Sequence, residues 1–573
     1  MAKAVLLGAS GAALGQALQA PQGVLARATL DAEGKLLTLD AIVNGGRGGA
    51  WPMLERSGLL YVPRDAFEEW RLPLPSHTEV FVLRGQNYYP LNGVPGFRSR
   101  IDTSNQSVDL TFSPLAFSNT RLAPGSAAAT PPRDAVLPAL LFNYDLNYSA
   151  ARARDSASSR DLGLLSEAVW SGAWGVLVHS SVARNLTGES AAAASRRVIR
   201  LETTYTLDFP QPNRTLRLGD SVTRPGLLGR HVYFGGAQLA SNYSFTPGFT
   251  GQALPVLSGV SSAPSTVELY VNDVLRQVSA VPAGPFSIDN FSGVSSAGEA
   301  RIVVRDLLGR ETVLVQPFFS HALLLATGHN EWSVEAGRQR IDFGNSSDAY
   351  GAAFGSALWR RGWTDQLTLE GRASATRKLL DLSGAATFEL PWQSLGTAAF
   401  AASDEQTAGR GTQWLLGIER QSLQGAFQLQ AQGATRRYRE LGVEPDRLPL
   451  HSLLGVNASR PLGARASVGA GLVRQTFWDA VPQTTVASIN FSMRLGERAS
   501  LNLNASRVLD GVNASAAGVS LLVPLERTIN AGVSVSRRAG SNDSQAYASQ
   551  LPPAEQGTGW RVVAGHRLGD ARA

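Results

Sequence analysis

Most of the chain consists of segments of about ten residues in which apolar and polar side chains alternate. In RLETTYTLDF, residues 200–209, this alternation places Leu201 and Tyr205 on one face and Glu202 and Asp208 on the other. The segments AFQLQAQ, SINFSMRL and LNLNAS, which begin at positions 426, 488 and 501, repeat the pattern. Because successive side chains of a strand point to opposite sides, each segment is predicted to be a β-strand between an apolar and a polar environment.

Two all-β architectures can use such strands, a soluble sandwich and a membrane-spanning barrel. The alternation continues over several hundred residues, and its apolar face is often small or aromatic instead of densely aliphatic. A sandwich rarely grows so large as one unit, whereas an outer-membrane barrel is built from strands with lipid on one face and a polar lumen on the other. The sequence therefore favours an all-β fold, a large transmembrane antiparallel β-barrel. A soluble sandwich is the alternative.

Composition argues against several functional classes. The net charge is +6 with no basic stripe or tail, which makes a nucleic-acid partner a poor hypothesis, and the absence of cysteine excludes disulfides and thiolate metal sites. No Walker-type loop or GxSxG elbow occurs, and GGRGGAW at 45–51 lacks the spacing of a dinucleotide loop. The histidines lack ligand spacing: His77, His179, His231, His321, His329, His451 and His566. We expect no enzyme, no cofactor and no metal site, with the histidines on surface or lumen positions.

The first 137 residues differ from the rest. Residues 1–20 contain one early cation, a short apolar stretch and small residues at a cleavage position, which predicts a secretory signal; a frayed apolar terminus is the alternative. Residues 21–120 predict a small mixed domain with an Asn44-Gly45 turn and a short helix that begins near Pro63. Residues 121–137, rich in Pro, Gly, Ser and Ala, predict a linker.

The alternating pattern is interrupted once. It runs through 138–253, breaks over 254–318 and resumes through 319–573. The interruption contains strand patterns at STVELYVN, VLRQVSAV, PFSIDNF and EARIVVRDL, separated by turn residues, which together predict a small β-sandwich. A folded insertion in a barrel hairpin could close the lumen, so we interpret this domain as a plug. Its candidate residues are Val267, Tyr270, Asn272, Asp273, Gly284, Phe286, Arg305, Gly309 and Arg310.

Charged residues on the polar face of barrel strands form a second candidate set. These lumen-facing candidates are Arg200, Glu202, Glu370, Arg372 and Arg494. Their side chains could hold the plug or line a path through the pore. Ordinary solvation of a wet channel wall is the alternative for the same residues.

Several motifs in one order resemble the outer-membrane fimbrial ushers of the chaperone-usher pathway. The resemblance rests on LRLGDSVT, FGGAQLASN, PSTVELYVND, GPFSIDNF, GEARIVVRDLLGRE, PFFSHALLLATG and WSVEAGRQR, spread over 216–340. YYPLNGVPGFRSRID at 88–102 adds a weaker similarity in the N-terminal domain. Asp273 and Ala283 depart from the family pattern, where glycine and proline are common, but both fit turns.

The resemblance implies a pore in the Gram-negative outer membrane that does not catalyse a reaction, with the N-terminal domain in the periplasm. Its partners would be a periplasmic chaperone, pilus subunits and outer-membrane lipid. Whether the protein forms a homodimer is left as an open alternative. The N-terminal domain would recruit chaperone-bound subunits, and Leu37, Leu39 and Ile42 are the recruitment candidates, with core packing as their alternative. Subunits would polymerise by exchange of a donor strand as the fibre is extruded.

Length is the main departure from the family. Ushers carry about two dozen barrel strands followed by periplasmic C-terminal domains, whereas this chain still alternates at its end. We expect an usher truncated at its C-terminus. A non-functional usher fragment and another plugged outer-membrane porin or transporter are the alternatives.

Overall fold

The computed structural model divides the chain into two compact units. One contains 1–123, 256–289 and 300–316, and the other contains 124–255, 290–299 and 317–573. The structure describes residues 34–74, 80–122, 136–151, 159–187, 197–246, 249, 251–253, 256–271, 274–288, 297–306, 309–444, 447–479, 482–496, 498–510, 514–526, 528–538, 541–551 and 558–569. The signal predicted at 1–20 and most of the linker therefore lie outside the described residues.

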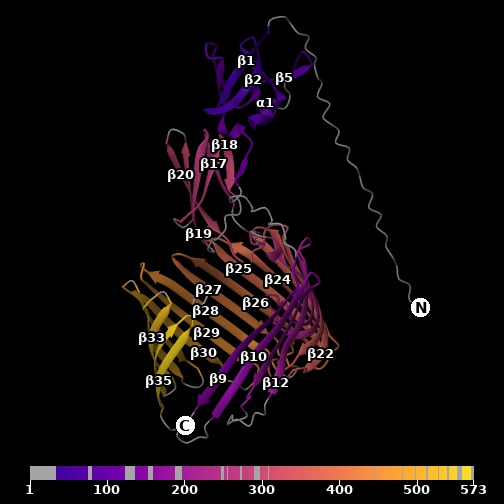
Figure 1. Ribbon diagram of the computed structural model, residues 1–573, viewed down its shortest axis with the longest axis vertical. Coiled ribbons are helices and arrows are strands. Elements are labelled where there is room, and N and C mark those ends of the chain that lie inside the picture. Colours follow the sequence, from indigo (N-terminus) through magenta and orange to yellow (C-terminus); the bar gives the residue numbers. More distant parts are fainter. Residues whose placement is uncertain are drawn as a thin grey trace, which may run out of the picture. The chain divides into compact units, whose positions relative to one another are not determined.

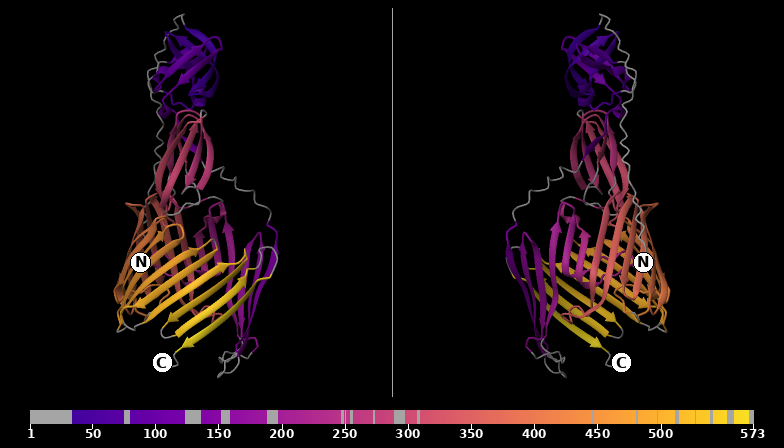
Figure 2. Two further views of the ribbon diagram at one scale, coloured as in Figure 1. Left: turned by 90° about the vertical axis from the view of Figure 1, so that its left-hand side faces the viewer. Right: turned by 90° about the vertical axis from the view of Figure 1, so that its right-hand side faces the viewer.

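The larger unit is an antiparallel β-barrel of twenty-one described strands, in which each strand is hydrogen-bonded to the next barrel strand along the chain (Figures 1 and 2). Its first strands are β9(Ala139–Ala151), β10(Ser159–Gly172), β11(Gly175–Arg184), β12(Arg197–Phe209), β13(Arg214–Val222) and β14(Tyr233–Ser241). The others are β21(Asn330–Arg340), β22(Tyr350–Thr364), β23(Leu367–Thr376), β24(Leu379–Leu390), β25(Ser394–Glu405), β26(Gly409–Ser422), β27(Gly425–Ala434), β28(Leu450–Leu462), β29(Ala466–Phe477), β30(Thr484–Leu495), β31(Ala499–Val508), β32(Ser515–Pro524), β33(Ile529–Arg538), β34(Ser541–Gln550) and β35(Trp560–Gly569).

The strands keep their two environments apart by the alternation seen in the sequence. In β26, Trp414, Leu416 and Ile418 are exposed on the outer face, whereas Leu415 points inward and is only 9% exposed. Large apolar side chains on the outside of a barrel match a wall that faces lipid. The predicted all-β barrel is confirmed. Among the described residues, no helix is long and apolar enough to cross a membrane.

Strand direction defines the two ends of the barrel. Each strand is antiparallel to its sequence neighbour, so β13, β21 and β27 all finish at the same end, here named the loop end. The connections after these strands are 223–232, 341–349 and 435–449. The folded insertion between β14 and β21 leaves from the opposite end, here named the insertion end.

The insertion is a β-sandwich. Its strands are β15(Leu257–Ser261), β16(Ser265–Val271), β17(Val274–Val281), β18(Gly284–Ile288), β19(Ala297–Asp306) and β20(Glu311–Phe319), in sheets of order β17-β16-β19-β20 and β15-β18-β8. The inward positions of β16 alternate as predicted, and Val267, Leu269 and Val271 are buried. Strand β8(Thr120–Leu122) pairs in parallel with β18, so residues 121 and 122 of the predicted linker belong to a sheet.

The N-terminal domain has a seven-stranded sheet of order β4-β5-β3-β2-β1-β7-β6. In chain order its strands and short helices are β1(Lys35–Val43), β2(Gly46–Arg56), β3(Leu59–Pro63), α1(Arg64–Glu69), β4(Phe81–Leu83), β5(Gln86–Pro90), η1(Leu91–Gly93), β6(Arg98–Asp102), β7(Ser107–Thr111) and η2(Pro114–Ala116). The remaining short helix, η3(Tyr243–Phe245), belongs to the larger unit. Asn44 and Gly45 both have positive φ, as the two-residue turn predicted between β1 and β2 requires. Phe67 of α1 and Met53 of β2 both belong to the buried core of this domain.

Candidate functional site in the barrel lumen

One connection at the loop end folds inward onto the wall. In the loop 223–232, the Arg224 backbone N–H donates to Glu335 Oε1 (3.0 Å), and the Leu227 N–H donates to Glu370 Oε1 (2.7 Å). Gly226 permits this approach, because a β-carbon there would collide with the Glu370 carboxylate. Leu228 is buried against Ala401, Leu415 and other apolar groups of the lumen wall. Carboxylates on the wall thus satisfy loop backbone that would otherwise lie unpaired inside the pore.

A second connection at the loop end, residues 435–444, packs beside the first. Burial raises the pKa of Tyr438, so its hydroxyl stays protonated and donates to Asp381 Oδ1 (3.2 Å). The Arg439 N–H donates to Ser403 Oγ (2.9 Å) on the wall. An ion pair of 2.6 Å between Arg230 and Glu440 joins the two inward segments. Burial also raises the pKa of Glu440, and the positive charge of Arg230 partly offsets this rise.

Wall charges lie beneath these two segments. Arg372 and Asp381 form a 3.1 Å ion pair whose side chains are only 2% and 1% exposed. Arg360 bridges Glu331 (2.8 Å) and Glu370 (3.3 Å). Two of the predicted lumen residues, Glu370 and Arg372, therefore belong to a connected, largely buried network that anchors inward-folded chain, which ordinary wall solvation would not require.

A second charged cluster stands in for backbone pairing that is missing between β12 and β13. The ladder between β12 and β13 ends at the Thr204–Gly219 pair, although β12 continues to Arg197. Gly219 has a φ of +103°, and the strand turns there so that Asp220 accepts from the Thr203 N–H (2.7 Å). The side chains of Asp220 and its partners thus occupy the place of the missing strand pairing.

Arg340 completes this cluster. Its guanidinium donates to the Leu201 carbonyl, to the Arg200 carbonyl (2.7 Å) and to Asp220 Oδ1 (3.0 Å). Arg200, predicted as a lumen residue, pairs with Asp220 and donates to the Ser347 carbonyl (2.9 Å). In a membrane-spanning wall every backbone group needs a partner. The cluster supplies these partners, so the structure assigns Arg200 a role in wall integrity.

The lumen face of the wall from β27 to β31 is nearly free of charge among its described residues. Across β27 to β31, one cross-strand row reads Gln428, Asn457, Gly471, Ser488 and Ser506. Arg494 is exposed on the face that carries Ser488, and Glu202 is exposed on β12. These two predicted lumen residues are not brought into the buried networks described above.

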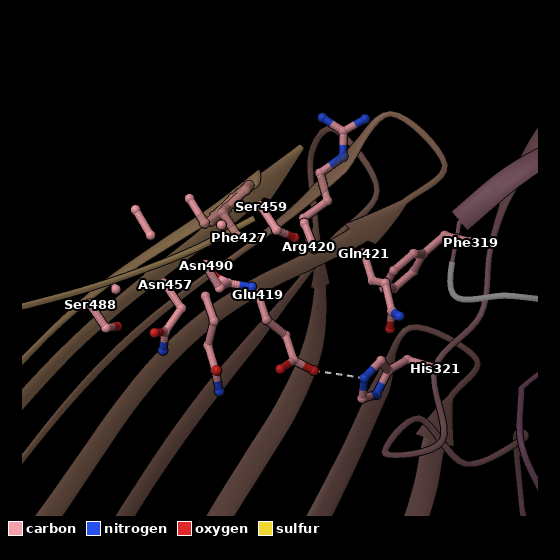
Figure 3. A pocket seen from close by; sticks show the side chains of 16 residues that line it. Phe319, His321, Glu419, Arg420, Gln421, Phe427, Asn457, Ser459, Ser488 and Asn490 are labelled. Atoms are coloured by element: carbon pink, nitrogen blue, oxygen red, sulfur yellow. Dashed lines mark ion pairs between the residues drawn. The ribbon is translucent and has the colours of Figure 1, made fainter. Parts of the chain in front are cut away.

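A polar pocket of about 330 Å³ lies between this wall and the chain that leaves the inserted domain (Figure 3). Phe319 and His321 come from that segment, and Glu419 comes from β26. His321 Nε2 lies 2.7 Å from Glu419 Oε1, the contact drawn as a dashed line in Figure 3. Asn457, Ser459, Ser488 and Asn490 line the wall side. His321, interpreted from the sequence as a bland surface or lumen histidine, is therefore a specific contact.

The residues predicted for the inserted domain are structural. Val267 and Phe286 are 1% exposed, Gly284 and Gly309 have positive φ, and Asn272 and Asp273 lie outside the described residues. Tyr270 donates to Glu268 (2.9 Å), Arg305 pairs with Glu311 (2.7 Å), and Arg310 pairs with Asp306 (2.6 Å). These groups order the sandwich and its turns.

The recruitment candidates lie on β1. Leu39 is buried in the N-terminal core, Leu37 packs partly against that core, and Ile42 is half-buried. Core packing, the alternative stated for these residues, describes the environment of Leu39. In the same domain, Asp102 accepts hydrogen bonds from Ser104 and Asn105, which lower its pKa to about 2.

An antiparallel barrel with an outward apolar face and a folded domain inserted between two strands defines an outer-membrane pore protein. The family model described as "Outer membrane usher protein" matches residues 169–572, more than half of the chain, and the chain belongs to this family. The fimbrial-usher resemblance and the predicted outer-membrane location are thereby confirmed.

Curated relatives are similar over part of their length. The chain is 26% identical over 331 residues to the outer membrane usher protein FimC of Bordetella pertussis, covering 53% of this chain and 38% of the relative. It is 26% identical over 272 residues to FimD of Escherichia coli, covering 46% and 30%. The chain thus spans less than two thirds of the length of these relatives.

A solved structure shares the fold. It is a cryo-EM structure of the E. coli P pilus tip assembly intermediate PapC-PapD-PapK-PapG in the second conformation. The TM-score is 0.61 at 18% identity, and the similarity covers 94% of this chain and 70% of that chain. At 18% identity this similarity shows a shared fold and nothing more.

Proposed function

We propose that this chain is an usher that recruits chaperone-bound pilus subunits and secretes them through a pore closed by the inserted domain. The observation that carries the proposal is the β-sandwich inserted between β14 and β21 of a barrel in an usher-family chain. A domain connected at both ends to neighbouring strands can block a wide lumen and leave it without being lost.

Secretion by this route requires that the protein binds and positions the subunits, and it involves no covalent step. The N-terminal domain would hold the incoming subunit complex, and the barrel would provide the exit. Replacement of a chaperone strand by a better-fitting subunit strand would supply the driving force, because main-chain pairing gives affinity and side-chain pockets give specificity. The P pilus intermediate, which combines PapC with PapD, PapK and PapG, supports this class of partner.

The two lumen walls suit this task differently. The charged wall would hold the inward-folded segments, and the hydrogen bond from Tyr438 to Asp381, beside the buried Arg372–Asp381 pair, supports this role. The row from Gln428 to Ser506 offers small, uncharged polar groups to a passing protein. Such groups stay hydrated and make few strong contacts, so a folded subunit could slide past without being retained.

Conductance in a planar bilayer tests the closed-pore part of the proposal. The full chain is compared with a variant in which residues 257–316 are replaced by a short Gly-Ser linker. We expect small conductance from the full chain and large conductance from the variant, because the lumen loses its blocking domain.

The matched control inserts the same linker after Gly463, in the turn between β28 and β29 at the insertion end. This control should conduct like the full chain. Equal conductance of the full chain and the deletion variant, with insertion into the bilayer verified for both, would contradict a pore closed by the inserted domain.

A further inference from the structure

The two chain segments that connect the inserted domain to the barrel are tied together. The Ala253 N–H donates to the Leu324 carbonyl (2.8 Å), and the Ala326 N–H donates to the Gly251 carbonyl (2.9 Å). Ser320, 1% exposed, donates to the Ala253 carbonyl (2.9 Å). The residues 251–253 and 320–326 therefore form one unit, here named the tether pair.

Strands β23 and β25 hold one side of the tether pair. The Leu325 N–H donates to Thr368 Oγ1 (2.8 Å), and Asp365 accepts from the N–H (2.8 Å) and hydroxyl (2.7 Å) of Thr327. Ala253 and Leu324 pack with Leu395 of β25 in a buried apolar cluster. These contacts fix the tether pair to the wall at the insertion end.

His321 connects the tether pair to a different part of the wall. Its Nδ1 accepts from the Leu323 N–H (3.1 Å), so the ring hydrogen is assigned to Nε2, which faces Glu419 Oε1 at 2.7 Å. Each nitrogen of the His321 ring thus has one defined partner. Figure 3 shows the imidazole aimed at the Glu419 carboxylate across the pocket.

We propose that the His321–Glu419 contact is a latch that restrains the outgoing tether, and with it the opening of the pore. The inference rests on the proposed function, in which the inserted domain closes the lumen. The boundary between the two compact units falls at Pro317, four residues before His321. Movement of the inserted domain therefore pulls on this contact before it reaches the hydrogen bonds of Leu325 and Thr327.

The latch predicts a change in the open probability of the full chain in a planar bilayer. His321→Ala and Glu419→Ala should each raise the frequency of large openings about tenfold, the factor that corresponds to loss of 1.4 kcal/mol. His321→Gln should restore the wild-type frequency, because its amide can still donate to Glu419. The control His451→Ala removes a histidine at the start of β28 and should leave the frequency unchanged.

A crosslink provides a second variant that does not depend on loss of packing. The chain has no cysteine, so His321→Cys with Glu419→Cys introduces a single pair of thiols, which a bis-methanethiosulfonate reagent of matching length can bridge reversibly. The crosslink should reduce large openings below the wild-type frequency, and its reduction should raise them to the His321→Ala frequency. Unchanged frequencies in the alanine variants, or openings that ignore a crosslink verified by mass spectrometry, would overturn the latch.

The failure of the latch and of the proposed function give different results. If replacing residues 257–316 does not enlarge the conductance, the inserted domain does not close the pore and both ideas fail. If that replacement enlarges the conductance while His321→Ala does not change openings, the closed pore stands and the latch alone is wrong.

Discussion

Replacing Arg340 by alanine should destabilise the barrel by about 3–5 kcal/mol, the cost expected when one partner of a buried ion pair is removed. The Arg340 side chain is 1% exposed and donates to Asp220 and to carbonyls of β12. Its loss leaves a buried carboxylate and backbone carbonyls without these donors, at a place where β12 and β13 no longer pair. Denaturant unfolding in detergent micelles, followed by circular dichroism, measures the loss.

Lysine should rescue the Arg340 site poorly. A guanidinium presents a planar fork of donors, and a single ammonium cannot meet a carboxylate and two carbonyls in the same geometry. Arg338→Ala is the matched control, because Arg338 lies on the same strand but is exposed. Arg340→Ala and Arg338→Ala with equal stability would show that the cluster does not support the wall.

The second large effect concerns Arg372. Arg372→Met should also cost about 3–5 kcal/mol, because Asp381 stays buried without its cation. The triple variant Arg372→Met, Asp381→Leu, Tyr438→Phe should recover most of this loss, because apolar residues of similar volume can replace a buried pair at little cost and phenylalanine removes the hydroxyl that donates to Asp381. Unfolding measurements on the single and triple variants test both statements.

Limited proteolysis adds a local readout for Arg372. Because Tyr438 donates to Asp381, a disturbed Asp381 should release the segment 435–444 and expose it to protease. The exposed pair Arg410–Asp404 provides the control, since Arg410→Met should change neither stability nor cleavage by much. Protection of 435–444 in Arg372→Met would contradict the anchoring role given to this network.

The barrel and the insertion were accessible from sequence because they depend on local patterns. Period-two alternation identifies a strand and its two faces wherever the faces meet different surroundings, as in β26. The turn at Asn44 and Gly45 depends on two adjacent residues that tolerate positive φ. Such patterns can be recognised without knowing which residues far apart in the sequence are in contact.

The networks depend on long-range contacts that alternation does not encode. Asp220 and Arg340 are 120 residues apart, and in the sequence each is one more polar position on a strand, which gives no reason to select it as a site residue. Tyr438 lies on a connection whose inward path is set by Asp381 of β24 and Gly411 of β26. His321 lacked metal-ligand spacing, which says nothing of its contact with Glu419 on a strand about a hundred residues later.

Secretion of pilus subunits by the host cell is the most direct test of the usher assignment. The gene is deleted and then restored on a plasmid that carries the full sequence, and surface fibres are counted by electron microscopy while periplasmic subunits are followed by mass spectrometry. We expect deletion to remove a class of fibre and to leave its chaperone-bound subunits in the periplasm, and we expect the plasmid to restore the fibres and clear the retained subunits. Unchanged fibres and no retained subunits after deletion would contradict the usher assignment.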